Sequence, residues 1–351
     1  MKTLPEWKLG EESLEKISAI DNPTLHRFIA KYVELCNPDK VFVSNGSPED
    51  VRYIREQAIE SGEEKKLATE GHTVHFDGYY DQARDEKNTK FLLPKGADLG
   101  PHINSIEREG GLGEIHELLK DSMRGHQMYV CFFCLGPTNS EFSLPCVQLT
   151  DSSYVAHSSV LLYRPGYEEF KKLGSSPSFF RFLHSEGELE DGVSKNVHQR
   201  RIYIDLEEDI IYSTNTQYGG NTIGHKKLAM RLAIHRASRE HWLTEHMFLM
   251  GVRGPKGRVS YFTGAFPSLC GKTSTSMLKG ETIVGDDIAY LRKNNGKMRA
   301  VNVEKGIFGV LQGLNSRDDP ILWETLHSPG EIIFSNVLVT EDKSVYWNGK
   351  D

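Results

Sequence analysis

The chain has 351 residues, enough for two domains, and its 38% hydrophobic and 26% charged residues are typical of a globular protein. It contains no run of about 18 apolar residues and no apolar signal-peptide core, so we expect no membrane partner and a cytoplasmic location. The net charge of -7, with no basic stretch denser than 225–227, argues against a nucleic-acid partner.

The first half of the chain alternates between predicted helices and strands. Apolar side chains at helical spacing predict helical structure over 11–37. Ser47 precedes a proline and two acidic residues, which predicts a capped helix over 48–61. Turns and short helices are expected over 165–200. The predicted strands are 41–46, 91–93, 128–136, 146–150 and 158–163, and 201–213 predicts a strand hairpin.

Five cysteines are present, an odd number without the spacing of a disulfide framework, which is typical of a reducing compartment. Cys131 and Cys134 match the C-x-x-C pattern of a metal or redox pair. They also lie in MYVCFFCLG, which has the composition of a buried strand. Two packed thiols are the favoured interpretation, and a metal or redox pair is the alternative.

The second half predicts a nucleotide-binding unit. A helix is expected over 228–240, followed by strands at 246–252 and 258–264. A loop rich in small residues and a short helix come next, and 281–285 predicts a further strand. Strand, loop, helix and strand in this order are typical of the βαβ unit of nucleotide-binding domains.

The loop at 265–277 contains Gly271, Lys272 and Thr273, the end of a phosphate-binding loop. In such a loop, backbone N–H groups hold phosphate, the lysine reaches the outer phosphates and the threonine holds the nucleotide's metal ion. Phe266 stands where the full pattern has its first glycine, so the triplet alone is weak evidence. The strand before it strengthens the prediction.

Asp286 and Asp287 end the apolar strand that follows the loop. Carboxylates at a strand end near a phosphate-binding loop are candidate ligands for a metal ion. The alternative is a simple turn, because Gly-Asp-Asp also suits turn geometry.

A glycine-rich loop at 218–224 runs into Lys226 and Lys227. Such a loop exposes backbone N–H groups and allows a substrate to approach closely, although a surface turn with solvated lysines is the simpler interpretation. His246 follows 19 residues after Lys227. A helix and an extended return of similar length allow the chain to bring this histidine back beside the lysine, although a lone histidine is more often structural.

Together these segments resemble GTP-dependent phosphoenolpyruvate carboxykinase. The likeness rests on five motifs in order: YGGNTIGHKK (218–227), WLTEHMFLMGV (242–252), YFTGAFPSLCGKTSTSM (261–277), VGDDIAYLR (284–292) and EKGIFGV (304–310). Weaker likeness extends upstream through GSPED (46–50), DQARDEKNTKFL (81–92), LTDSSYVAHSS (149–159), LYRPGYEEF (162–170) and FLHSEG (182–187). The resemblance covers nearly the whole chain.

The resemblance implies conversion of oxaloacetate and GTP to phosphoenolpyruvate, CO2 and GDP, a reaction of gluconeogenesis. It implies a catalytic Mn2+ bound by Lys227, His246 and Asp287, and Mg2+ or Mn2+ with GTP. The implied substrate contacts are Arg84, Tyr218, Gly219, Gly220 and Ser268. The implied GTP phosphate loop is Leu269, Cys270, Gly271, Lys272, Thr273 and Ser274. Catalytic roles are implied for a reactive Cys270, Lys226 and Lys272, with Asp286 beside the site.

The resemblance also implies a monomer with a two-lobed α/β fold and a catalytic cleft between the lobes. Residues 1–235 would form the substrate-binding lobe with a mixed sheet, and 236–351 an incomplete nucleotide- and metal-binding lobe that carries the phosphate loop. A lysine that binds a metal must be neutral, so Lys227 is expected to have a lowered pKa because Mn2+ and Lys226 are adjacent.

The sequence departs from the family pattern at three places. Ser274 replaces a common asparagine, the spacing from Lys227 to His246 is one residue shorter, and the family continues past the position of Asp351. A chain that binds Mn2+ and phosphates without turnover is therefore the alternative function. An ordinary P-loop kinase or ATPase is a third hypothesis, against which Phe266 and the loop at 218–224 both argue.

Overall fold

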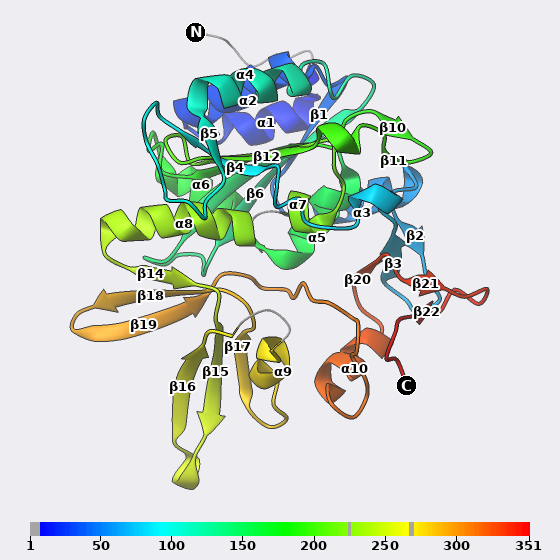
Figure 1. The fold of residues 1–351 in the computed structure, drawn as a ribbon, viewed down its shortest axis with the longest axis vertical. Helices are drawn as coiled ribbons and strands as arrows, with labels where there is room; N and C mark the ends of the chain where they lie inside the picture. The colour runs from blue at the N-terminus through cyan, green and yellow to red at the C-terminus, as the bar shows by residue number, and fades with distance from the viewer. Residues whose placement is uncertain (1–7, 224–225, 267–269) are drawn as a thin grey trace.

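The computed structural model describes residues 8–223, 226–266 and 270–351. Figure 1 shows a large upper lobe built around one sheet and a smaller lower lobe of short sheets. The two-lobed α/β fold predicted from the sequence is confirmed. Within the described parts of the chain, none of the helices has the length and apolarity that a membrane crossing requires.

The upper lobe contains a nine-stranded sheet in the order β1-β6-β7-β9-β13-β12-β4-β5, with β8 paired to β6. Parallel pairs such as β1 with β6 and antiparallel pairs such as β6 with β7 make the sheet mixed. Its strands are β1 (Lys40–Ser44), β4 (Thr89–Leu93), β5 (Ser105–Glu107), β6 (Gln127–Leu135), β7 (Leu144–Thr150), β8 (Arg164–Pro165), β9 (Phe180–Ser185), β12 (Arg201–Asp205) and β13 (Ile210–Thr214).

Helices cover both faces of this sheet (Figure 1). In β6, Val130 and Phe132 pack in one core cluster, whereas Tyr129, Cys131 and Phe133 pack in another, because successive side chains of a strand point to opposite faces. The first cluster lies under α1 (Glu11–Ser18), α2 (Pro23–Cys36), α4 (Arg108–Leu119) and α6 (Tyr167–Leu173). The second lies under α3 (Pro48–Glu60), α5 (Ser153–Leu162) and α8 (Lys227–Glu240).

The strand predicted at 158–163 is wrong, because these residues belong mainly to helix α5. Ser152 caps the helix by accepting from the Val155 N–H at 3.2 Å. The Glu63 carboxylate accepts from the next two free N–H groups, those of Ser153 and Tyr154. Nearly every residue of the helix is buried, so its sequence carries no amphipathic period that distinguishes it from a buried strand.

The helical structure predicted over 11–37 is confirmed, and it consists of two helices, α1 and α2, with a break at 19–22. Asn22 accepts from the Leu25 N–H at 2.9 Å, and Pro23 supplies the first helical residue, where a missing N–H costs nothing. Strand β9 lies inside the region predicted to hold only turns and short helices.

Other sequence predictions are confirmed. Helix α3 begins after Ser47, whose hydroxyl accepts from the Asp50 N–H. Strands β12 and β13 form the predicted hairpin. Cys131 and Cys134 are free, buried thiols, and burial raises the pKa of both.

The lower lobe contains the predicted strand, loop, helix and strand unit. β15 (Phe248–Arg253) lies between β16 (Val259–Gly264) and β17 (Thr282–Gly285) and is antiparallel to both. β16 and β17 are therefore parallel, and α9 (Lys272–Ser276) lies in the connection between them. The neighbouring sheet consists of β14 (Leu243–Glu245), β18 (Ala289–Asn294) and β19 (Lys297–Asn302).

Near the end of the chain, β20 (Ile332–Ser335) runs back to a strand from the N-terminal half of the chain, at the right of Figure 1. β20 pairs in parallel with β3 (His72–His75), and Val74, Phe334 and Trp347 share a small core. The remaining elements are β2 (Lys65–Lys66), β10 (Leu189–Glu190), β11 (Val193–Ser194), β21 (Leu338–Val339), β22 (Val345–Tyr346), α7 (Gly219–Thr222), α10 (Pro320–His327) and 3-10 turns at Tyr79–Asp81, Val197–Gln199 and Pro255–Gly257.

The segment after β19 joins the two lobes through backbone hydrogen bonds. The Val303 carbonyl accepts from the Gly136 N–H at 3.0 Å and from Arg164 Nη1 at 2.9 Å. The Leu162 carbonyl at the end of α5 accepts from the N–H groups of Lys305 and Gly306. Gly306 passes so close to the helix end that a Cβ there would lie 2.5 Å from the Leu161 carbonyl oxygen.

Replacing Gly306 with alanine should therefore destabilise the contact between the lobes. We expect Gly306→Ala to lower the free energy of unfolding by about 1–3 kcal/mol, because backbone must move to admit the methyl group. Urea denaturation measures the change. Gly309→Ala is the matched control, since a Cβ at Gly309 meets nothing within 4 Å. Equal stability of the two variants would contradict the prediction.

Candidate active site

The Asp287 carboxylate lies at the centre of the candidate site. Its Oδ1 accepts from His246 Nε2 and from Lys272 Nζ, and its Oδ2 lies 3.0 Å from Lys226 Nζ. Lys272 Nζ also donates to the Asp287 backbone carbonyl at 3.0 Å. The structure thus brings together four of the residues that the sequence analysis selected, from four separate segments.

Local structure explains how these segments meet. Lys226 immediately precedes α8, and the chain leaves that helix at His241, whose φ of 60° is the left-handed conformation that often ends a helix. β14 then runs back along the helix, and His246 stands just before β15. Asp287 follows β17, which pairs with β15. The reversal after α8 that the spacing allowed is therefore present.

Opposing forces act on Asp287. Burial alone would raise the pKa of this carboxyl, but its hydrogen bond to His246 and the charges of Lys226 and Lys272 hold the pKa well below its usual range. Asp287 is 6% exposed and Lys272 is 8% exposed, so little water screens these interactions. The carboxylate stays ionised and fixes the nitrogen groups around it.

The two adjacent lysines differ in environment. Burial works to lower the pKa of Lys226, but the charges of Glu304, Asp287 and Asp286 outweigh it and raise that pKa. Burial lowers the pKa of Lys227, and the charges of Arg84, Lys226 and Lys272 lower it further, against the charge of Asp287. The lowered pKa predicted for Lys227 is confirmed in direction, with burial as the first cause.

Glu304 is a second buried carboxyl in the same cluster. It is 2% exposed, and its Oε1 lies 3.9 Å from Lys226 Nζ. Burial raises the pKa of Glu304 to about 7, and the negative charges of Asp287 and Asp286 add to this rise while Lys226 opposes it. Sequence reasoning included this residue in a family-like motif but gave it no role.

The phosphate loop enters the site through Gly271, whose φ of +77° favours glycine and turns the chain into the short helix α9. Thr273 Oγ1 donates to Asp286 Oδ2 at 3.1 Å, which places the hydroxyl and the carboxylate expected at a nucleotide's metal ion side by side. Ser274 Oγ donates to Asp319 Oδ1. Cys270 is exposed, and Ser268 and Leu269 lie outside the described residues.

Arg84 and the glycine-rich loop lie against one another. A Cβ at Gly220 would lie 3.2 Å from Arg84 Cγ and 2.5 Å from Tyr218 Cε1. A Cβ at Gly219 would lie 3.3 Å from the Phe308 ring, and the Phe308 carbonyl accepts from Lys226 Nζ at 3.0 Å. The expected substrate contacts therefore adjoin the Asp287 cluster through Phe308.

The donor set suits a divalent cation. Imidazole nitrogen from His246, carboxylate oxygen from Asp287 and an amine whose protonation is disfavoured at Lys227 are ligand types that metal ions accept. The buried Asp287 Oδ2 has an ion pair but no well-aligned hydrogen bond within the described residues, which leaves a lone pair for a metal. In the same part of the chain, no three His, Cys, Asp or Glu side chains cluster as a metal site.

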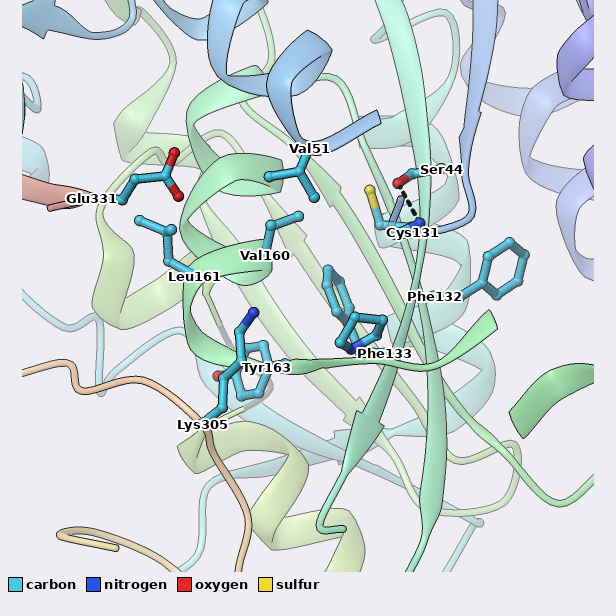
Figure 2. Close-up of a pocket in the computed structure, with 12 residues that line it drawn as sticks. Ser44, Val51, Cys131, Phe132, Phe133, Val160, Leu161, Tyr163, Lys305 and Glu331 are labelled. Atoms are coloured by element: carbon cyan, nitrogen blue, oxygen red, sulfur yellow. Dashed lines mark hydrogen bonds between the residues drawn. The ribbon is translucent and has the colours of Figure 1, made fainter. Parts of the chain in front are cut away.

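A separate cavity of about 100 Å³ lies between α3, α5 and β6 (Figure 2). Val51, Val160, Leu161 and Phe133 give it an apolar lining, with Lys305 and Glu331 among the polar side chains drawn. None of the candidate site residues lines it. The Cys131 thiol there is buried and its pKa is raised, which makes it a poor nucleophile.

Two protein-family models match consecutive parts of the chain. The family model described as the phosphoenolpyruvate carboxykinase N-terminal domain matches residues 27–238. The family model described as the phosphoenolpyruvate carboxykinase C-terminal P-loop domain matches residues 242–351.

Curated relatives carry the name phosphoenolpyruvate carboxykinase [GTP]. The protein from Thermococcus sibiricus is 61% identical over 97% of this chain and 55% of its own length. The protein from Pyrococcus horikoshii is 60% identical over the same shares, and that from Chlamydia trachomatis is 35% identical over 95% of this chain and 58% of its own length. The chain thus spans about half the length of the curated relatives it matches.

The exposure of Cys270 predicts selective alkylation. Under native conditions we expect iodoacetamide to label Cys270 at least about tenfold faster than the four buried cysteines, because reaction needs an accessible thiolate. Peptide mass spectrometry follows the labelling. A Cys270→Ser variant should remain unlabelled until it is denatured. If Cys131 is labelled at a comparable rate in the native protein, the prediction that Cys270 is the accessible cysteine is wrong.

The raised pKa of Glu304 predicts a pH-dependent stability. A carboxyl that titrates near 7 when folded and near 4.5 when unfolded binds more protons in the folded state between these values, so stability falls as pH rises through that window. The Glu304→Gln variant has no carboxyl to titrate here, so its stability should not fall in this pH window for this reason. As pH rises from 5 to 8, we expect the unfolding free energy of the variant to increase by about 1–3 kcal/mol relative to that of the parent chain. A difference independent of pH, measured by urea denaturation, would contradict this.

Proposed function

Since the chain belongs to the GTP-dependent phosphoenolpyruvate carboxykinase family, we propose that it provides the substrate, metal and phosphate sites for the reaction of oxaloacetate and GTP that gives phosphoenolpyruvate, CO2 and GDP. The observation that carries the proposal is the meeting of His246, Lys226 and Lys272 on the single carboxylate of Asp287. One of these nitrogens belongs to the phosphate loop, and another adjoins the glycine-rich loop.

In this proposal the substrate binds at the glycine-rich loop. Arg84 has an exposed side chain beside Gly220, where a guanidinium can pair with a carboxylate of oxaloacetate. The absence of side chains at Gly219 and Gly220 allows the substrate to approach the backbone. Lys227, His246 and Asp287 would hold Mn2+, which when bound withdraws electrons from the ketone and stabilises the enolate left by loss of CO2.

In this proposal phosphoryl transfer takes place at the phosphate loop. In this proposal Lys272, held at Asp287, offsets negative charge on the γ-phosphate as the enolate oxygen forms its bond to phosphorus and GDP departs. Thr273 and Asp286 would hold the metal ion that accompanies GTP. Lys226 is 5% exposed and keeps its proton, so it adds positive charge beside the forming enolate. Cys270 borders the loop and is placed here as a residue near the phosphates.

The organisation proposed with this reaction is a substrate-binding lobe at 1–235, a nucleotide- and metal-binding lobe at 236–351, and a monomer in the cytoplasm acting in gluconeogenesis. The family membership and the two adjoining profile matches support the division. Binding of Mn2+ and phosphates without turnover is the competing function, since the described ligands would suffice for binding alone.

Turnover separates these functions. We expect GTP-dependent formation of phosphoenolpyruvate from oxaloacetate with Mn2+, and a loss of at least about 100-fold in kcat/KM for Lys272→Ala and for Asp287→Asn, because each removes charge that acts on the reacting groups. Lys279→Ala is the matched control, an exposed lysine just beyond α9. It should retain parental activity.

Other outcomes have distinct meanings. Binding of Mn2+ and GTP without product would favour the competing function. Activity that survives in both Lys272→Ala and Asp287→Asn would exclude the proposed site. GTP hydrolysis that does not need oxaloacetate would favour an ordinary P-loop ATPase.

A further inference from the structure

Arg200 joins the two segments that would bind the substrate. We propose that Arg200 is a positioning residue, which fixes the segment that carries Arg84 against the glycine-rich loop and so sets the affinity for the carboxylate substrate. The inference deepens the proposed function and rests on it for the identity of the ligand. Sequence reasoning gave Arg200 no role, because it lies just before β12 and outside every motif.

The Arg200 guanidinium binds two carboxylates that flank Arg84 in sequence. Its Nε lies 2.6 Å from Asp85 Oδ2, and its Nη1 lies 3.2 Å from Asp81 Oδ1. Nη1 also donates to the Tyr80 carbonyl at 3.0 Å. Asp81 is 1% exposed and Asp85 is 7% exposed. A buried carboxylate is costly without a cation or hydrogen-bond donors beside it, and Arg200 supplies a cation to both of these carboxylates.

Asp81 connects the segment to the start of the glycine-rich loop. Its Oδ1 accepts from Thr216 Oγ1 at 2.6 Å, and its Oδ2 accepts from the Gln217 N–H at 2.7 Å. The Tyr218 N–H lies 3.4 Å from the same Oδ2. One carboxylate therefore fixes the backbone that leads directly into Tyr218 and Gly219.

The other flank of Arg84 is connected to the end of the loop. The Asp85 N–H donates to Asn221 Oδ1 at 3.1 Å, and Asn221 Nδ2 donates to the Ala83 carbonyl at 3.2 Å. Asp85 is held in turn by Arg200 and by Asn88. The residues on both sides of Arg84 are thus bonded to the residues on both sides of Tyr218, Gly219 and Gly220.

Arg84 and Arg200 have opposite situations. Arg200 is engaged with both carboxylates, whereas Arg84 is exposed and its guanidinium has no ion pair within residues 8–223, 226–266 and 270–351. Arg200 therefore holds the backbone in place, whereas Arg84 is available to a ligand. An error in the position of Arg84 weakens a charged hydrogen bond steeply, because such bonds depend on distance and direction.

Calorimetric titration with phosphoenolpyruvate in the presence of Mn2+ tests the inference. We expect Arg200→Gln to weaken binding of phosphoenolpyruvate about tenfold or more and to leave the Kd of GDP within about twofold. Arg200→Lys keeps the charge but cannot bridge both carboxylates, so it should fall between the parent and Arg200→Gln.

Arg108→Gln is the matched control. Arg108 also binds a buried aspartate, Asp205 at the opposite end of β12, but it lies away from the glycine-rich loop. Loss of the Arg108 guanidinium should reduce the stability of the protein without weakening the binding of phosphoenolpyruvate. If Arg108→Gln and Arg200→Gln weaken binding equally, or if neither does, the positioning role is excluded.

Hydrogen exchange separates failure of the inference from failure of the proposed function. In Arg200→Gln the amides of Gln217 and Asp85 should exchange at least about tenfold faster than in the parent, and Arg108→Gln should leave them unchanged. If the parent chain binds no phosphoenolpyruvate, the proposed function fails and these exchange rates alone decide whether Arg200 holds the loop. Unchanged exchange in Arg200→Gln would overturn the inference whether or not the parent binds. If Arg200→Gln does not fold, Asn221→Ala, which removes the other link, should show the same weakening.

Discussion

The site depends on one buried carboxylate that is shared by three nitrogen groups. Asp287 contacts Lys226 at the start of α8, His246 before β15 and Lys272 at the start of α9, so its charge joins both lobes. Buried lysines are costly unless an opposite charge lies beside them. Asp287 supplies that charge, with Asp286 close by, and Glu304 adds to it when ionised. The positions of the glycine-rich loop, the metal-ligand candidates and the phosphate loop are therefore linked through a single electrostatic cluster.

Neighbouring lysines acquire different chemistry from this cluster. Lys226 faces carboxylates and keeps its proton, whereas burial, aided by neighbouring positive charges and opposed by Asp287, lowers the pKa of Lys227. The sequence shows only two consecutive lysines. The difference arises from the groups around each side chain, since Glu304, Asp287 and Asp286 raise the pKa of Lys226 while burial lowers that of Lys227.

Local patterns predicted those parts of the fold that local interactions decide. The caps at Ser47 and the turn at Gly271 follow from nearby residues, as does the strand, loop, helix and strand unit of the lower lobe. Helix α5 was missed because burial on all sides removes its periodicity and because Glu63, which accepts from two further N–H groups at its start, lies about 90 residues away in sequence. Glu304 and Arg200 were missed for a related reason, since each gains its role only from partners distant in sequence.

The segment from β19 to Phe308 makes the docking of the lobes and the geometry of the site a single physical problem. Its Val303 carbonyl is bound by Gly136 and Arg164 of the upper lobe, and its Gly306 lies against the end of α5. Between these two contacts in sequence, Glu304 faces Lys226. Just after them, the Phe308 carbonyl accepts a hydrogen bond from the same lysine. A shift of the lobes must move this segment and with it two partners of Lys226. Because the Phe308 ring also packs at Gly219, the same shift reaches the glycine-rich loop. The contact between the lobes therefore does more than stabilise the fold. It determines both which charges surround Lys226 and how closely Phe308 packs on the glycine-rich loop.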